Sequence, residues 1–584
     1  MSPPSPLLQP PDRRETRVSR GWVLGIVAAV FVAYANTLAV PFVFDDIAAV
    51  TRNPSLVSLA RALVPPDGMS VTGRPLVNLT LAVNHALSGT VPWSYHALNL
   101  MLHAASALLL FGVVRRGLAS VTPLAGSSAA LSTDAVAGWT ALVWAVHPLQ
   151  SASVTYVMQR SELLASTCLL AALYAFARAV GKGETDTRAP MAGPWAAAAV
   201  AATFAGMASK EVMAGAPLVL LLYDRTFVSG SVRAALRRRP AFYTALASSW
   251  LLLAWLVFGS ESRGASAGFA SATAWTEYAA TQVYAVAHYL RLALWPSALV
   301  FDYGTPLITD PVRLAPGGVA LAAIVVGTAF TWHRWPAVGF CGCTFFVLLA
   351  PSSSVVPIAT QTIAEHRVYL ALALPVVLVV AALYRWLGRR AGFVAAAAGA
   401  VLLIATVARN RDYATVQTLW ADTVRKAPAN PRAHYNLALA QLDAGRRAEA
   451  LDSLAATTRL AAEHAAAHQK RGELLLADGR PADALPHLEA SVRLQPEAAA
   501  AHFMVAHAYI QLNRAADALP RYAEAVRLAP THAAARYNLG NALAQAGRYG
   551  EALAQFEEAS RLDPADESAR KNASRIRDYL RFAR

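Results

Sequence analysis

Charged residues are scarce in this 584-residue chain. Asp, Glu, Lys and Arg make up only 15% of it, whereas hydrophobic residues make up 56%, and the mean hydropathy is +0.37. Soluble globular domains usually carry about 25% charged residues, so this composition excludes a wholly water-soluble fold. Most of the apolar surface must meet lipid, which predicts a membrane protein.

Cysteine is nearly absent as well. The three cysteines, Cys168, Cys341 and Cys343, all lie inside apolar segments. They favour neither a disulfide framework nor a thiolate metal site, and we interpret them as packing residues.

Acidic residues are fewer than basic ones, which gives a net charge of +15. Much of the arginine lies in short loops between apolar runs, so the charge indicates membrane topology and not a nucleic-acid partner.

Long apolar runs are what the chain has in abundance. A membrane-spanning helix needs about 20 apolar residues. Twelve segments qualify: 21–40, 97–114, 136–156, 162–180, 193–208, 212–228, 241–259, 278–298, 314–331, 337–356, 368–386 and 391–408. They predict a polytopic domain over 21–409, preceded by a cytoplasmic tail at 1–20. The first run lacks a small-x-small cleavage site, so we expect an uncleaved anchor.

The arginine clusters predict how these segments cross the membrane. With a cytoplasmic N-terminus, alternation puts Arg115–Arg116, then Arg178, Lys182 and Arg188, then Arg233 to Arg239 in the cytoplasm. Later clusters, at 333–334 and 385–390, agree only if one segment does not cross. We expect the segment near 278–300 to be re-entrant or interfacial, which leaves eleven spans and puts the C-terminal region outside the cytoplasm.

The C-terminal region repeats every 34 residues. Turn residues recur at Gly445, Gly479, Asn513 and Gly547, small residues at Ala450, Ala484, Ala518 and Ala552, and prolines at Pro496, Pro530 and Pro564. This order is that of tetratricopeptide repeats. We therefore predict a connecting helix or linker at 410–430, four repeats over 431–566 and a cap helix at 567–584 that covers the open end of the stack. Such stacks bind extended peptides, which suggests that the repeats hold an extended protein or peptide.

Ionisable residues are few on the predicted outer face. They are Asp45, Asp46, Arg74, His85, His96, His103, His147, Arg160, Glu162, Lys210, Glu211, Glu365, His366 and Arg367. Charges at a membrane boundary are costly unless they are paired or functional. Adjacent carboxylates such as Asp45 and Asp46 raise each other's pKa and can act as a general base or bind a cation, although a solvated helix terminus is an alternative.

Three cations, Arg160, Lys210 and Arg367, sit at the outer ends of spans. They either pair with the neighbouring Glu162, Glu211 and Glu365, or form an anion site for a lipid-linked phosphate or diphosphate. Carboxylates on one loop that face cations on others would make a glycosyl or phosphoryl transfer site at the membrane surface.

Sequence motifs along nearly the whole chain carry a resemblance to a known family. In order they are Phe42-Val43-Phe44-Asp45-Asp46 with Asn53-Pro54, Arg74-Pro75-Leu76, Asn84-x4-Gly89-x2-Pro92-x2-Tyr95-His96-x2-Asn99-x3-His103, Ala145-Val146-His147-Pro148, Gln159-Arg160-Ser161-Glu162-Leu163-Leu164-Ala165, Ser209-Lys210-Glu211 and Ala364-Glu365-His366-Arg367-Val368-Tyr369-Leu370. Together they resemble the transmembrane and tetratricopeptide-repeat O-mannosyltransferases and their bacterial relatives. That family is similar to the C-type glycosyltransferases, which take a sugar from a polyprenyl-phosphate donor.

The resemblance implies a role for each site residue. Asp45 and Asp46 match the acidic motif, one of them deprotonating a Ser or Thr hydroxyl, and Arg160, Lys210 and Arg367 become candidates for the donor phosphate. Supporting residues would be Arg74, His96, His147, Glu162, Glu365 and His366. The chain departs from the family at Gly73, where tyrosine is expected, and at Ala371-Leu372, in place of Pro-Ser. No metal is assigned, because His85, His96 and His103 could equally form one polar helix face, and no feature supports a divalent cation.

The sequence therefore predicts an all-α protein: a polytopic membrane domain of the C-type glycosyltransferase kind, followed by a tetratricopeptide-repeat solenoid. The expected function is transfer of a sugar, a hexose such as mannose, from a polyprenyl-phosphate donor to Ser or Thr of a secreted or periplasmic protein held by the repeats. The expected location is a bacterial inner membrane, with the repeats periplasmic. The alternative is a non-enzymatic membrane scaffold, for which one span would suffice.

Overall fold

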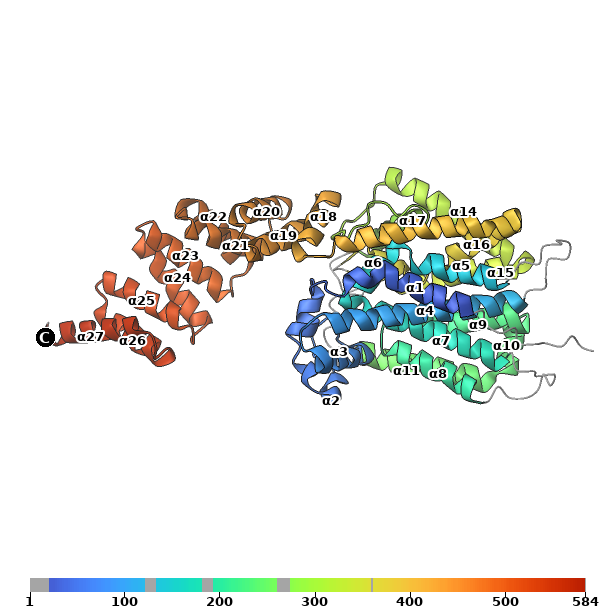
Figure 1. Cartoon of the computed structure of the whole chain (residues 1–584). Coiled ribbons are helices and arrows are strands. Elements are labelled where there is room, and N and C mark those ends of the chain that lie inside the picture. The colour runs from blue at the N-terminus through green and yellow to red at the C-terminus, as the bar shows by residue number, and fades with distance from the viewer. Residues whose placement is uncertain are drawn as a thin grey trace, which may run out of the picture. The chain divides into compact units, whose positions relative to one another are not determined.

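The computed structural model describes residues 20–120, 133–180, 193–259, 274–354, 356–358 and 361–582. The predicted cytoplasmic tail, apart from Arg20, and the basic residues Lys182 and Arg188 lie outside these ranges. The described residues form helices and turns and contain no β-strand, which confirms the all-α class. The chain divides into two compact units, Met1–Leu419 and Trp420–Arg584 (Figure 1).

The first unit is a bundle of helices, and each of the twelve apolar segments overlaps one of them, although the segment 136–156 continues past the end of α5 into η4 (Pro148–Gln150) and α6 (Ser151–Thr155). The overlapping helices are α1 (Arg20–Tyr34), α4 (Trp93–Ser120), α5 (Thr133–Ala145), α7 (Arg160–Val180), α8 (Pro194–Met207), α9 (Ala216–Asp224), α11 (Pro240–Phe258), α13 (Trp275–Leu294), α14 (Pro311–Arg334), α15 (Pro336–Leu349), α16 (Ala373–Leu387) and α17 (Ala391–Arg411). Among the described residues, seven helical stretches are long and apolar enough to cross a membrane. The chain is a membrane protein.

Contacts between helix ends show that successive helices run in opposite directions. Arg115 at the end of α4 pairs with Asp134 at the start of α5, at 2.6 Å. Likewise the guanidinium of Arg178, near the end of α7, lies 4.7 Å from the ring centroid of Trp195 at the start of α8. The end of the bundle that holds these arginines is called the basic end below. The opposite end, where α1 and α5 end and loops follow them, is called the loop end.

Other arginines gather at the same basic end. Arg239, just before α11, donates to Asp224 at the end of α9 at 2.8 Å, and Arg225 donates to the carbonyl of Trp332 near the end of α14 at 2.8 Å. The described arginines Arg115, Arg178, Arg225 and Arg239 therefore share one end of the bundle. This is the charge asymmetry that orients polytopic proteins in a bilayer.

Helix α13 is the exception to the alternation. Its Tyr278 hydroxyl donates to the Ser352 carbonyl at 2.9 Å, and its Tyr289 hydroxyl accepts from the Ala364 N–H at 2.9 Å, so both contacts fall on the loop between α15 and α16. Near its last turn, the Ala293 carbonyl accepts from His147 at 3.2 Å. Both ends of α13 thus contact loops at the loop end. That the segment does not cross the membrane stays a prediction.

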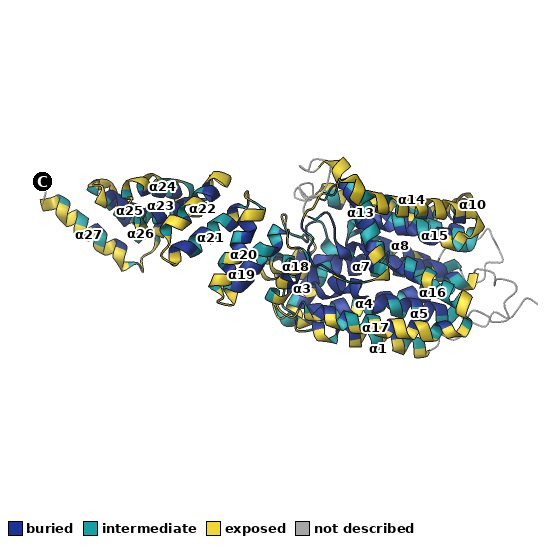
Figure 2. Ribbon diagram, turned by 90° about the horizontal axis from the view of Figure 1, so that it is seen from above, coloured by how far each residue is buried: buried dark blue, intermediate teal, exposed yellow. Residues whose placement is uncertain are grey.

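Exposed tryptophans lie at both ends of the bundle. Trp93, Trp275 and Trp295 sit at the loop end, and Trp335 and Trp386 at the basic end; all five are more than half exposed. Tryptophan concentrates at the two membrane–water interfaces because its ring is apolar and its N–H is polar. Figure 2 shows that α14 exposes most of its surface, as expected of a lipid-facing helix.

The first and last long helices close the bundle against each other. Asn410 in α17 donates through Nδ2 to the Ala33 carbonyl in α1 at 2.9 Å, and Asn36, just after α1, donates to the Val407 carbonyl at 3.1 Å. The first of these bonds satisfies a backbone carbonyl that α-helical pairing leaves open in the last turn of α1.

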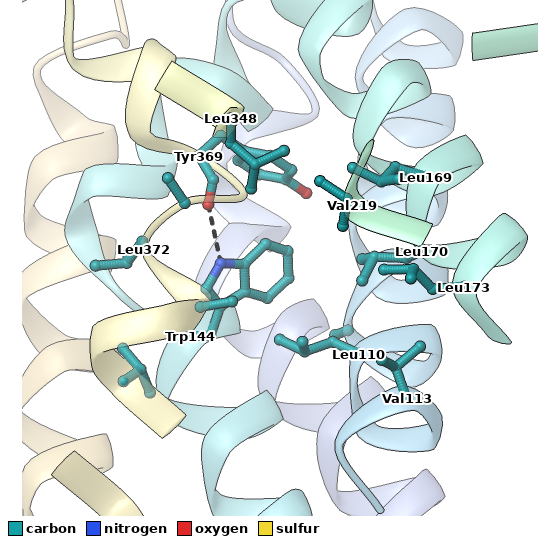
Figure 3. Close-up of a cluster of buried hydrophobic side chains, with 14 of the residues drawn as sticks. Leu110, Val113, Trp144, Leu169, Leu170, Leu173, Val219, Leu348, Tyr369 and Leu372 are labelled. Atoms are coloured by element: carbon teal, nitrogen blue, oxygen red, sulfur yellow. Dashed lines mark hydrogen bonds between the residues drawn. The ribbon is translucent and has the colours of Figure 1, made fainter. Parts of the chain in front are cut away.

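The core of the bundle holds three buried rings, Trp144, Tyr369 and His103, of which Figure 3 shows the first two. Trp144 donates through Nε1 to the Tyr369 carbonyl at 2.9 Å. His103 donates to the Ala145 carbonyl at 2.9 Å through Nε2, so its Nδ1 accepts from the Tyr369 hydroxyl at 2.8 Å. These bonds fix Tyr369, two residues after Arg367. The core therefore holds the loop that carries the Glu365-His366-Arg367 sequence.

The second unit is a stack of helix pairs. The pairs are α19 (Pro431–Asp443) with α20 (Arg447–Leu460), α21 (Ala465–Ala477) with α22 (Pro481–Leu494), α23 (Ala499–Gln511) with α24 (Ala515–Leu528), and α25 (Ala533–Gln545) with α26 (Tyr549–Leu562), and α27 (Glu567–Phe582) follows them. Helix α18 (Val416–Lys426) lies in the predicted connecting segment.

Local sequence explains the geometry of the stack. The four turn residues have positive φ, from 60° at Asn513 to 76° at Gly547, which favours glycine or asparagine. The recurring alanines are fully buried where helices cross, and a Cβ at Gly540 would lie 2.8 Å from the Phe556 ring. Small residues are therefore required for each pair to close.

Labelling single cysteines from one side of the membrane tests this arrangement. In a chain with its three native cysteines replaced, cysteine at Trp275 and at Trp295 should react with an impermeant maleimide from the same side, because α13 does not cross. Cysteine at Arg238 should react only from the other side. The reaction of Trp275→Cys and Trp295→Cys from opposite sides would overturn the non-crossing assignment.

Candidate functional site

The acidic pair lies in the loop that follows α1, at the loop end. Asp46 is fully buried, and its two carboxylate oxygens accept from the Val43 N–H at 3.1 Å and from the Met158 N–H at 2.8 Å. Asp45 is half-buried. Just before the pair, Phe44 has a φ of 51°, a conformation that costs a bulky residue about 1–3 kcal/mol. The surrounding contacts must supply that energy, and they hold the pair in place.

The two carboxyl groups differ in their protonation. Burial raises the pKa of Asp46 to about 8, and the charge of Asp45 adds to this, while the two backbone N–H bonds act in the opposite direction. Asp46 therefore retains a proton near neutral pH more readily than an exposed aspartate does. Asp45 interacts with Tyr156: its N–H donates to the Tyr156 hydroxyl at 3.2 Å, and its carboxylate accepts from that hydroxyl.

Arg160 occupies a fully buried cage at the start of α7. Its Nε donates to Asn99 at 2.8 Å, Nη1 to Asn84 at 2.6 Å and Nη2 to the Tyr95 carbonyl at 2.8 Å. All three acceptors are uncharged oxygens, and the side chain has no exposed surface. The guanidinium joins α7 to α4 and to α3 (Pro75–Ser88). This geometry leaves it no direct route to a donor phosphate, although the sequence suggested one.

Lys210 and Arg74 form two neighbouring ion pairs. Lys210 Nζ lies 2.6 Å from Glu162, and Arg74 Nη2 lies 3.3 Å from Glu211. The sequence suggested pairing between adjacent residues, but Lys210 binds the more distant Glu162. Arg74 also donates through Nη1 to the Ser70 carbonyl, and its Nε is buried without a partner among the described residues. A buried N–H that lacks an acceptor is costly and favours an incoming oxygen atom.

The last part of the candidate site is the 3₁₀-helix η8 (Glu365–Val368). Arg367 is buried and donates to the carbonyls of Thr362 at 3.0 Å and Gln361 at 2.5 Å. Glu365 accepts from the Val300 N–H at 2.6 Å and the Tyr303 hydroxyl at 2.8 Å. Both side chains therefore fix loops.

Between them, His366 is half-buried, and its pKa is held well below the usual value. The causes are burial first and then the nearby charges of Lys210, Arg367 and Arg74. His366 is consequently neutral at physiological pH. The four residues Arg74, Lys210, His366 and Arg367 are called the cation group below. The structure brings these four together, whereas Arg160 is apart from them in its cage.

The remaining predicted histidines bind backbone. His96 donates to the Val40 carbonyl at 2.9 Å, and His147 accepts from the Leu149 N–H and donates to the Ala293 carbonyl. They join loops at the loop end of the bundle. Within the described ranges, no three His, Cys, Asp or Glu side chains form a group able to hold a metal ion.

The first turn of α7 and the residues just before it connect all these parts. Met158 binds Asp46, Arg160 fills the cage and Glu162 binds Lys210. Four residues of helix rise about 6 Å, so the acidic pair and the cation group converge at one end of the bundle. Sequence analysis missed Tyr156 and the roles of Asn84 and Asn99. The last two stand in the quoted motif, but a motif does not reveal which charge an amide will bind.

A half-buried carboxylate and a cluster of cations at the loop end of the bundle can act together. The carboxylate can accept a proton from an incoming hydroxyl, and the cations can bind a phosphate and stabilise it as a leaving group. The geometry thus suits group transfer from a phosphorylated donor.

Comparison with known proteins agrees with both units. Tetratricopeptide-repeat families match residues 431–456, 475–520 and 503–567. The chain is 34% identical to "Protein O-mannosyl-transferase Tmtc3" of Drosophila melanogaster over 28% of this chain and 20% of that protein. It is 30% identical to Tmtc2 of the same organism over 47% of this chain and 29% of that protein, and 31% identical to human TMTC3 over 29% and 18%. These findings confirm the resemblance that the motifs carried.

The matched region spans less than a third of the length of each of these relatives. Among solved structures, "YrrB: a TPR protein with an unusual peptide-binding site" is 21% identical and covers 30% of this chain and 87% of that one, with a TM-score of 0.26. The "MamA RS-1 ArsTM double mutant" is 22% identical and covers 26% and 85%, with a TM-score of 0.25.

The cage around Arg160 should be essential for stability. Arg160→Gln leaves buried oxygens without their donors, so we expect a loss of about 1–3 kcal/mol in the free energy of unfolding for each oxygen left unpaired. Arg160→Lys should also destabilise, because one ammonium cannot reach three divergent acceptors. Thermal unfolding of the purified protein measures both. Arg52→Gln, an exposed arginine at the same end, is the control and should not shift the midpoint; an unchanged midpoint for Arg160→Gln would contradict the cage.

Proposed function

We propose that this chain is a membrane protein O-glycosyltransferase. It moves a sugar, a hexose such as mannose, from a polyprenyl-phosphate donor to a Ser or Thr hydroxyl of a secreted or periplasmic protein. The observation that carries the proposal is the half-buried Asp45 at the same end of the bundle as the cation group. Similarity to proteins named O-mannosyl-transferases supports it.

Asp45 is the catalytic base in this proposal. A Ser or Thr hydroxyl is a weak nucleophile at neutral pH, so a positioned carboxylate that accepts its proton lowers the barrier. The hydroxyl oxygen attacks the anomeric carbon, its proton passes to Asp45, and the bond between that carbon and the phosphate oxygen breaks. Tyr156 orients Asp45 through its hydroxyl. Asp46 is the buried anchor that fixes the loop.

The cation group binds the phosphate of the donor. Arg74 offers its buried Nε, and Lys210 and His366 add N–H donors, so negative charge that develops on the leaving phosphate is stabilised. Arg367 contributes its charge while its N–H groups hold the loop. Glu162, Glu365, His96, His147 and Arg160 are positioning residues, because their polar atoms contact protein groups.

The tetratricopeptide repeats present the acceptor. Stacked repeats form extended concave surfaces suited to unfolded or extended polypeptide. The positive-inside rule places the basic end in the cytoplasm, so the loop end and the repeats face the periplasm of a bacterial inner membrane. A non-enzymatic scaffold remains the competing function, and loss of transfer in an Asp45 variant separates the two.

Substitutions in the acidic pair should give two distinct defects. Asp45→Asn should lower single-turnover sugar transfer by about 100- to 10,000-fold while thermal stability and donor binding stay unchanged, because only the base is lost. Asp46→Asn replaces an accepting oxygen with an NH₂ that faces a backbone N–H, so it should lower the unfolding midpoint as well as transfer. Asp67→Asn, an exposed residue of the same loop, is the control. Wild-type transfer by Asp45→Asn would sink the proposed base.

Donor binding should depend on pH through His366. Its pKa is lowered in the free protein by burial and by three cations, and a bound phosphate offsets those charges and raises that pKa. Binding then takes up a proton, so donor affinity should rise as pH falls below the bound-state pKa and level off below the free-state pKa. Binding measured from about pH 5 to 8 tests this. His366→Gln should flatten the curve, and an equally steep curve in that variant would exclude His366 as its origin.

A further inference from the structure

A pocket separate from the candidate functional site lies at the basic end, between α1, α4 and α7. It has a volume of about 270 Å³ and combines two kinds of surface. Val23, Leu108 and Leu109 line it with aliphatic carbon, and Arg115, Arg116 and Tyr174 line it with polar or amphipathic groups. All three helices belong to candidate membrane spans, so the aliphatic wall lies at hydrocarbon depth and the arginines at its boundary.

Arg116 is the unusual member of this pocket. Its guanidinium lies 4.8 Å from the centroid of the Tyr174 ring. That ring packs directly on Gly112, where a Cβ would come within 2.5 Å of it, so the glycine fixes the ring. Arg115 pairs with Asp134 at 2.6 Å, whereas Arg116 makes no ion pair within the described part of the chain. A ring compensates a cation only partly at a membrane boundary.

The cationic surface continues beyond the pocket. Tyr174 meets Trp195 edge to face at 6.3 Å between ring centroids, and Arg178 lies 4.7 Å from the Trp195 centroid. Arg178 likewise has no ion pair among the described residues. One half-buried guanidinium therefore lies on each ring of this aromatic pair, Arg116 at the pocket and Arg178 beside it. Guanidinium groups bind phosphate oxygens in bidentate fashion, and the rings keep them pre-organised.

We propose that this pocket binds the phosphate headgroup of an anionic diacyl phospholipid, with an acyl chain along Leu108 and Leu109. Basic pockets between membrane helices on the cytoplasmic side are suited to such headgroups. The chemistry is shared with a polyprenyl phosphate, but the location favours a bilayer phospholipid. Tyr95, which contacts Arg160, and Arg116 are 21 residues apart in α4, or about 30 Å, so the pocket lies across the bilayer from Asp45 and the cation group.

Lipid binding to the purified full-length protein tests the proposal. In mixed micelles, phosphatidylglycerol should bind saturably and raise the thermal unfolding midpoint, while phosphatidylcholine should not. Native mass spectrometry should show the retained anionic lipid. Because each basic residue near a bilayer surface strengthens anionic binding by about fivefold, Arg116→Gln should weaken the phosphatidylglycerol effect about fivefold and the double variant with Arg178→Gln about 25-fold.

Two further variants make the outcome decisive. Arg237→Gln removes the same charge from an exposed position of α10 (Val232–Arg238) at the same end, and it should change binding less than twofold. Arg116→Lys keeps the charge and should retain most of the binding even if Arg116→Gln unfolds. Equal stabilisation by phosphatidylglycerol and phosphatidylcholine would overturn the proposal. So would binding of phosphatidylglycerol that is equally strong in the wild type, in Arg116→Lys and in Arg116→Gln. Displacement of phosphatidylglycerol by lower concentrations of polyprenyl phosphate would assign the pocket to that lipid instead.

Discussion

A single buried guanidinium organises the loop end of the membrane unit. Arg160 donates to three uncharged oxygens that come from α3 and α4, and it has no exposed surface. Burying a cation without a carboxylate is tolerable only when hydrogen bonds compensate it, and here each of the three nitrogens finds an acceptor, which forces the three acceptors into one geometry. The start of α7 is thereby fixed, and with it the N–H of Met158 and the carboxylate of Glu162.

The two halves of the candidate site depend on that fixed turn in different ways. Asp46 is held through backbone N–H groups, so the acidic loop follows the chain of α7 directly. Lys210 is held through the side chain of Glu162, so the cation group follows a side-chain contact that has more freedom. On the far side, Trp144 and His103 fix Tyr369 and so locate η8. The acidic pair and the cation group are thus both held by the start of α7, and the core fixes η8 as well.

Local sequence signals predicted the fold, because helix length, hydropathy and the 34-residue repeat are local properties. The charge of the loops also predicted that α13 does not cross the membrane. The pairing inside the site was less predictable. Lys210 lies next to Glu211 in sequence but pairs with Glu162, 48 residues away, and Arg74 pairs with Glu211, 137 residues away. Tertiary packing decides which side chains meet across such distances. The sequence around each residue therefore does not reveal its partner.

The contact between α1 and α17 has a consequence for biogenesis. Asn410 binds the Ala33 carbonyl across 377 residues of chain. At about 5–20 residues per second, roughly 20–75 s of synthesis separates the first helix from the last, and during that time one flank of α1 has no final neighbour. Apart from Arg20 at its start, α1 carries no charged residue, so lipid can solvate the nascent helix until closure. The assembling chain can therefore wait in the bilayer for its last helix without exposing a charge to hydrocarbon.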